Sequence, residues 1–118
     1  MTTRETPRLL SVTPVKSGRE QEFEAFIRDV IVPAVSQHRP HLTGQWQSLR
    51  PEDDLHGDGT RAYAFLFYGD APVDDWDVDS LFTTAFGEDE GNKRIQQWTD
   101  LLDGDQTNVY FAGEVDSA

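Results

Sequence analysis

The sequence predicts an α+β domain whose elements follow the order β-α-β-β-α-β. Residues 60–69 are rich in Tyr and Phe and lie between turns that contain Gly, Asp and Pro, a pattern typical of a buried central strand. Two other stretches, 17–35 and 89–102, carry apolar side chains at helical spacing. The length of 118 residues and the hydrophobic content of 36% suit one domain with a modest core.

The composition excludes several classes of function. A net charge of −12 repels nucleic acid and anionic membranes, so we expect neither as a partner. The absence of cysteine excludes disulfides, thiolate metal sites and cysteine nucleophiles. No apolar run approaches the roughly 18 residues of a membrane span, and the N-terminus lacks the apolar core of a signal peptide. We therefore expect a cytoplasmic protein.

The first half of the chain is expected to begin with a strand and a helix. Residues 1–7 are polar and expected to be frayed, and Arg8–Val15 is the first predicted strand. Ser17 and Glu20 match the S-x-x-E capping box, which predicts a helix start here. The helix then carries an apolar stripe made of Phe23, Phe26, Ile27, Val30, Ile31, Ala34 and Val35.

A second strand is expected after this helix. Pro33 should kink or shorten the helix near its end. Leu42–Arg50 is then the second predicted strand. Its alternation assigns one face to Leu42, Trp46 and Ser48, and the other to Gln45, Gln47 and Leu49.

The second half of the chain is expected to contain the central strand, Thr60–Gly69, and three further elements. Asp79 is a candidate cap for a short helix, Ser80–Phe86, which precedes Gly87. The second main helix is predicted over Asp89–Leu102. The last strand is predicted over Thr107–Val115.

This order of elements predicts the split βαβ, or ferredoxin-like, arrangement with an antiparallel sheet. The strands at 8–15 and 60–69 are then central, and both helices cover one face. Because the strands carry apolar residues on both faces, a monomer would expose a large apolar surface. We therefore expect a homodimer in which two sheets face each other. A single domain should span 1–118, with 116–118 frayed.

The N-terminal quarter carries a more specific pattern. Leu10–Phe23 reads L-S-V-T-P-V-K-S-G-R-E-Q-E-F, a strand followed by K-x-G-[RK]-E-x-x-F at the start of a helix. In this stretch, and in its element order, the chain resembles the dimeric α+β barrel superfamily. More narrowly, it resembles the antibiotic-biosynthesis monooxygenase group. The acidic insert 70–79 is longer than is usual there, and it is expected to cover or reshape a pocket between sheet and helices.

The resemblance implies a dimeric α+β barrel and a cofactor-independent oxygenation of a small aromatic or polyketide-like substrate. The implied chemistry is proton abstraction from a phenol or carbon acid, followed by reaction of the anion with oxygen. The alternative is a non-catalytic protein of the same fold that binds a small ligand or only dimerises.

The aromatic side chains predict a ligand cavity. The candidate lining residues are Trp46, Phe65, Phe67, Phe82 and Trp98. They would stack a flat apolar ligand. The alternative is that they fill the core and the dimer interface. Within the central strand, we expect Tyr63, Phe65 and Phe67 to face the pocket.

Two residues are candidates for the chemistry. His41 is the candidate general base, since an imidazole titrates near neutral pH. Tyr63 is the candidate hydrogen-bond partner of a substrate oxygen. The alternatives are an exposed loop histidine and a tyrosine that satisfies a backbone group.

Metal and cofactors are not expected. His38, His41 and His56, with Asp53 and Asp54, could be drawn as a metal site, but the proline at position 40 breaks the helix that would align the first two. Some haem-binding relatives carry an axial histidine on the second helix, and residues 80–103 contain none. Nucleotide-binding glycine motifs are also missing.

Overall fold

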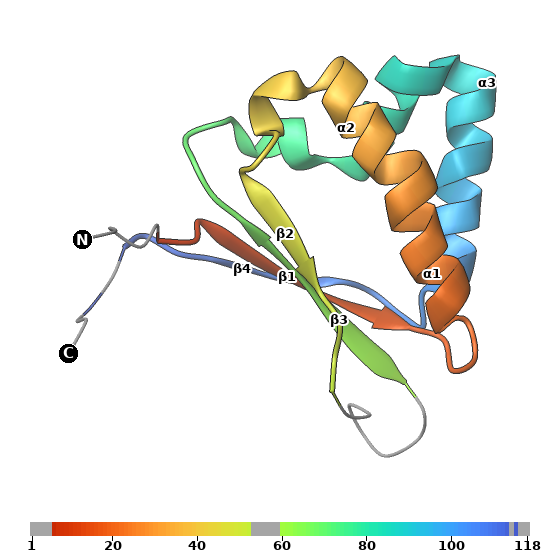
Figure 1. Cartoon of the computed structure of the whole chain (residues 1–118), viewed down its shortest axis with the longest axis horizontal. Coiled ribbons are helices and arrows are strands. Elements are labelled where there is room, and N and C mark those ends of the chain that lie inside the picture. The colour runs from red at the N-terminus through yellow and green to blue at the C-terminus, as the bar shows by residue number, and fades with distance from the viewer. Residues whose placement is uncertain (1–5, 53–59, 114, 116–118) are drawn as a thin grey trace.

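The computed structural model describes residues 6–52, 60–113 and 115, which form one sheet with helices on one of its faces (Figure 1). The strands are β1 Leu9–Val15, β2 Trp46–Leu49, β3 Arg61–Phe67 and β4 Thr107–Tyr110. The helical elements are α1 Glu20–Phe26, η1 Ile27–Ile31, α2 Val32–His38, η2 Pro40–Leu42, η3 Val73–Trp76 and α3 Val78–Leu101. None of the helices in the described ranges is long and apolar enough to cross a membrane.

The sheet is antiparallel throughout, with the strand order β2-β3-β1-β4. The two inner strands pair along their full length, from Leu9 opposite Phe67 to Val15 opposite Arg61. The α+β class and the central position of the strand within Thr60–Gly69 are thereby confirmed. The strand order is compatible with a ferredoxin-like fold.

The two faces of the sheet differ in what covers them. Tyr63 and Phe65 are buried at 3% and 5% exposure, beside Thr13 and Ser11 of β1. Their rings pack against Phe23 of α1 and Trp98 of α3, so they point to the face that carries the helices. The alternate residues of the inner strands point to the other face, as the period of two requires. These residues are Leu10, Val12, Pro14, Ala62, Ala64 and Leu66, and each is only half-buried.

The first long helix starts at a different cap from the predicted one. Arg19 occupies the N-cap position and makes no side-chain capping bond, so the prediction that Ser17 caps the helix is wrong. Instead, the Gly18 amide donates to Glu20 Oε1 at 3.3 Å. Gly18 has a φ of +82°, a conformation that glycine adopts without steric cost, and it sets the turn before the helix.

This helix also passes through Pro33 and ends only at His38. The five residues Ile27–Ile31, which end two positions before the proline, form a π-helical turn. A wider turn removes the clash between the proline ring and the carbonyl four residues earlier, and it needs no amide hydrogen from the proline. Of the two predicted effects of Pro33, a kink or a shortening, the shortening is wrong, since the helix continues to His38.

The two outer strands are shorter than predicted. Gly44 takes a φ of +79° and interrupts the extended backbone, so β2 begins at Trp46 and Leu42 belongs to the preceding 3-10 turn. Trp46 and Ser48 pair with Phe67 and Phe65, which confirms their predicted shared face. Strand β4 ends at Tyr110 and not at position 115.

The predicted pair of C-terminal helices is present as two segments of α3 that meet at Gly87, whose φ of 81° and ψ of 177° are not helical. The cap is Asp77, whose side chain accepts a hydrogen bond from the Ser80 amide at 3.1 Å, and not Asp79. The segments approach closely, since a Cβ on Gly91 would lie 2.9 Å from the Phe82 carbonyl oxygen.

Candidate functional site

A cavity of about 680 Å³ lies between the helix-bearing face of the sheet and the helices. This volume is in the range of small-molecule sites, about 300–1,000 Å³. The sheet contributes Leu9, Ser11, Trp46, Phe65, Phe67, Asn108 and Tyr110 to the lining. The helical layer contributes Ile31, Val35, Leu81, Trp98 and Thr99. The segment before α3 and the first two residues of α3 contribute residues 73–79.

Aromatic rings form much of this lining. Four of the predicted residues, Trp46, Phe65, Phe67 and Trp98, line the cavity. Their rings form a continuous surface, since the Phe65 centroid is 6.5 Å from Trp46, 6.4 Å from Phe67 and 6.2 Å from Trp98. Such a surface offers π faces to a flat ligand. With Trp76, all three tryptophans of the chain line the cavity.

The acidic segment predicted to reshape a pocket forms the rim of this cavity. Trp76 packs its ring 4.6 Å from that of Phe67. Its indole nitrogen is buried and has no hydrogen-bond partner in the described ranges. The charged lining residues are all aspartates, at positions 74, 75, 77, 79 and 105. The cavity therefore combines an aromatic interior with a negatively charged mouth.

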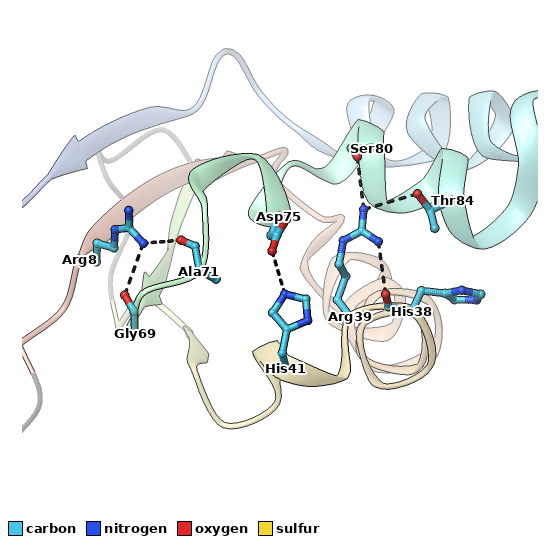
Figure 2. A network of polar contacts seen from close by, with 9 residues as sticks. All are labelled: Arg8, His38, Arg39, His41, Gly69, Ala71, Asp75, Ser80 and Thr84. Atoms are coloured by element: carbon cyan, nitrogen blue, oxygen red, sulfur yellow. Dashed lines mark hydrogen bonds and ion pairs between the residues drawn. The ribbon is translucent and has the colours of Figure 1, made fainter.

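Side chains from other elements tether this rim (Figure 2). Arg8 donates to the carbonyl oxygens of Ala71 and Gly69, the latter at 3.5 Å. Arg39, after α2, donates to the hydroxyls of Ser80 at 3.3 Å and Thr84 at 3.4 Å. These contacts fix both ends of the segment that leads into α3.

His41 reaches the cavity only through a carboxylate. Its Nε2 lies 2.8 Å from Oδ2 of Asp75, a residue that lines the cavity (Figure 2). A carboxylate only accepts hydrogen bonds, so the imidazole nitrogen is the donor. The His41 side chain is 52% exposed and is not part of the lining in the described ranges. Asp75 therefore lies between the cavity and the His41 side chain.

Tyr63 and Phe82, the other two predicted site residues, lie outside the lining of this cavity in the described ranges. The Tyr63 hydroxyl donates to Glu24 Oε2 at 2.5 Å, and its ring packs 4.7 Å from that of Phe23. Phe82 is fully buried and packs 5.8 Å from Phe26. Both residues contribute to the core between helices and sheet.

The Glu24 carboxylate is held by two donors. Two hydrogen bonds lower the pKa of Glu24 to about 2: the one from Arg50 has the larger effect, and the one from Tyr63 the smaller. Burial and the bond to Glu24 raise the pKa of Tyr63. The tyrosine therefore stays protonated at neutral pH and remains a donor to the carboxylate. This network joins α1 to β3 and to the residue after β2.

Several polar residues of the lining were not singled out in advance. Ser11 on β1 is buried, and its Oγ accepts a hydrogen bond from Gln106 Nε2 at 3.3 Å. Asn108 lies opposite Ser11 in the sheet, and Tyr110 lies opposite Leu9. Period-two alternation in β4 puts positions 108 and 110 on one face, but only the register tells which face meets the cavity.

A further candidate from the sequence is a metal site formed by His38, His41 and His56 with Asp53 and Asp54. His56, Asp53 and Asp54 lie outside the described residues. Among the residues that the structure does describe, no group of three or more His, Cys, Asp or Glu side chains is placed to hold a metal ion. The rim aspartates therefore do not converge on one point.

The fold and this cavity define the class: an α+β domain with an aromatic small-molecule cavity on the helix side of its sheet. No family model matches the chain, and no curated protein matches it in sequence. The function is therefore inferred from the cavity and its charges.

Replacing Glu24 should change how stability depends on pH. The folded pKa of Glu24, about 2, lies below its ordinary value of 4.5, so its stabilisation is complete above 4.5 and is lost as the pH falls toward 2. For Glu24→Gln we expect the free energy of unfolding at neutral pH to fall by about 1 kcal/mol. The acid-induced loss in this window should also become smaller. Urea unfolding at a series of pH values measures both.

Glu22→Gln is the matched control, since among the described residues Glu22 pairs with the surface residue Arg19 alone. In this variant, the free energy of unfolding should fall between pH 4.5 and pH 2 as much as it does in the wild type. If Glu24→Gln kept the full acid dependence of the wild type, the Glu24 network would not carry this stabilisation.

Proposed function

We propose that this protein binds a small, flat aromatic or polyketide-like molecule in the cavity between its sheet and its helices. The observation that carries the proposal is the continuous aromatic surface of Trp46, Phe65, Phe67 and Trp98 around a space of about 680 Å³. A planar ligand gains from area burial and from offset stacking, which contributes about 0.5–1.5 kcal/mol for each aromatic pair.

Polar groups in the same cavity support orientation of such a ligand. Ser11, Asn108 and Tyr110 come from the neighbouring strands β1 and β4 and line the cavity. Sites for small molecules commonly combine a mostly apolar lining with a few polar groups that fix orientation. A ligand with a ring body and one or two carbonyl or hydroxyl groups matches this division.

Binding should be visible in the protein's own fluorescence, because all three tryptophans line the cavity. We expect a neutral flat probe, 1-naphthalenemethanol, to change tryptophan emission with a saturable dependence on concentration. Trp46→Ala should weaken binding about tenfold or more, since it removes one wall of the aromatic surface. Trp76 and Trp98 still report in this variant, and calorimetry checks the affinity.

Val32→Ala is the control for this experiment. Val32 is 42% exposed on α2 and is not part of the cavity lining. It should bind the probe as the wild type does. Equal weakening in both variants, or binding that never saturates, would contradict a ligand site in this cavity.

A catalytic version of this function is favoured by one further observation, the pair of His41 and Asp75 at the rim. We propose that the bound molecule is a phenol or carbon acid that loses a proton to this pair and then reacts, as its anion, with oxygen without a cofactor. Asp75 meets the ligand and accepts the proton, and His41, which donates a hydrogen bond to Asp75, holds this carboxylate in position. General-base catalysis of this kind contributes about 10²–10⁴-fold.

His41→Gln should separate catalysis from binding. We expect oxygen consumption with a panel of phenols and anthrones to fall about 100-fold, while the affinity for the same compounds stays within about twofold. His38→Gln is the matched control, because His38 lies on the exposed end of α2 and not in the cavity lining. Unchanged turnover in His41→Gln would remove His41 from the proposed mechanism. No oxygen consumption by the wild type would leave only the binding function.

We also infer that a second copy of this chain covers the bare face of the sheet, forming a homodimer of the α+β barrel type. Leu10, Val12 and Leu66 lie at the centre of this face, and Leu49 and Val109, each 43% exposed, lie on its outer strands. A monomer rarely leaves so continuous an apolar surface in water. A face of the same chemistry on a second copy is self-complementary under two-fold symmetry.

Light scattering coupled to gel filtration tests the dimer. The wild type should elute with twice the mass of the chain, and Leu66→Lys should elute as a monomer because it places a charge at the centre of the interface. Val32→Lys, on the helical layer, should remain dimeric. A wild type that stays monomeric at high concentration would contradict the inferred dimer.

A further inference from the structure

We infer that the cavity selects an aromatic ligand that carries a positive charge. This inference rests on the proposed binding function and specifies the chemical class of the ligand. Every charged side chain in the described lining is an aspartate, and no lysine, arginine or histidine side chain lines the cavity in the described ranges. The charge of the mouth is therefore of one sign.

The aspartates of the mouth come from two parts of the chain. Asp74 and Asp79 belong to the rim segment before and at the start of α3, and Asp105 belongs to the connection between α3 and β4. In the part of the chain that the structure describes, these three carboxylates form no ion pair. Asp75 is paired with His41, and Asp77 caps α3.

The two arginines that tether the rim, Arg8 and Arg39, do not neutralise the mouth. Arg8 directs its guanidinium to the backbone carbonyls of Gly69 and Ala71 (Figure 2). Arg39 directs its guanidinium to hydroxyl groups on the first segment of α3 (Figure 2). Both guanidinium groups are absent from the lining in the described ranges. They fix the rim in position without placing a positive charge inside it.

The aromatic interior favours the same sign of charge independently of the carboxylates. The faces of aromatic rings carry negative potential, and tryptophan is the strongest partner for a cation among them. Trp46, Trp76 and Trp98 all line the cavity, and Phe67 lies against Trp76. A ligand cation is therefore attracted both by the ring faces inside and by the carboxylates at the mouth.

A bare metal ion does not fit this arrangement. No set of three or more His, Cys, Asp or Glu side chains in the described ranges converges on a single point. A divalent ion needs several oxygen ligands at short distance. An organic ammonium group is satisfied by more dispersed carboxylates and by π faces.

A positive charge on the ligand also resolves a conflict within the catalytic proposal. Loss of a proton from a phenol or carbon acid leaves an anion, and the surrounding carboxylates disfavour that anion. An ammonium group on the same molecule offsets this repulsion. We therefore expect substrates of the proposed reaction to carry an amine as well as the acidic group.

Three matched probes test the inference on the full chain by calorimetry at low salt. They share one ring system and differ in charge: 1-naphthylmethylammonium, 1-naphthalenemethanol and 1-naphthoate. We expect the ammonium to bind about tenfold more tightly than the alcohol, and the carboxylate to bind more weakly than the alcohol. Added salt should reduce these differences, since it screens exposed charges.

Two triple variants locate the source of the preference. Asp74→Asn, Asp79→Asn and Asp105→Asn together remove three rim charges, and they should reduce the preference for the ammonium to about threefold or less. Glu22→Gln, Asp29→Asn and Asp89→Asn together change the net charge equally at positions outside the lining. They should leave the preference unchanged. An equal reduction in both triples would assign the preference to overall charge and overturn the inference.

The outcomes also distinguish this inference from the proposed function. If the alcohol binds as tightly as the ammonium, or the naphthoate more tightly, the inference is overturned while the binding function stands. If none of the three probes binds, the binding function itself fails. A tighter ammonium complex that depends on the rim triple supports both.

Discussion

The contact that the whole arrangement depends on is the aromatic cluster in which Phe23 of α1 and Trp98 of α3 pack against β3. Phe23 is fully buried, and its ring lies 4.7 Å from Tyr63 and 5.2 Å from Trp98. Burying a ring of this size contributes about 1.5–3 kcal/mol. The ring centroid of Trp98 also lies 6.2 Å from that of Phe65, and both of these rings line the cavity. The core and the ligand cavity therefore share one wall.

This shared wall divides the helix-bearing face of the sheet into two halves. Over the half that contains Tyr63, the helices bury the side chains of the sheet. Glu24, which is paired with Arg50, accepts the hydrogen bond from the Tyr63 hydroxyl there. Over the half that contains Phe67, the short 3-10 helix η3 packs Trp76 against Phe67 at the edge of the cavity. This segment also supplies Asp74, Asp75 and Asp77 to the lining.

Much of the fold could be predicted from periodicity, while contacts distant in sequence could not. The turns around Thr60–Gly69 and its dense aromatics identified the central strand. Alternation divided its side chains into two sets but did not reveal which set faces the helices. The sequence favoured Asp79 as the cap, whereas the helix begins at Val78 and is capped by Asp77, two positions before Asp79. Tyr63 and Phe65 share a face, but the sequence does not reveal that Glu24 takes the tyrosine hydroxyl. The pairing of His41 with Asp75 likewise joins residues 34 positions apart.

The central claim is that a flat aromatic molecule occupies the cavity between sheet and helices. A ¹H–¹⁵N correlation spectrum tests it most directly, because the three tryptophans give three separate indole signals and all three rings line the cavity. Titration with a naphthalene probe should move these signals together, with one saturable binding curve. Amide signals of residues at the far end of the sheet, such as Arg61, should stay in place. Indole signals that remain fixed while other surface signals shift would contradict the account.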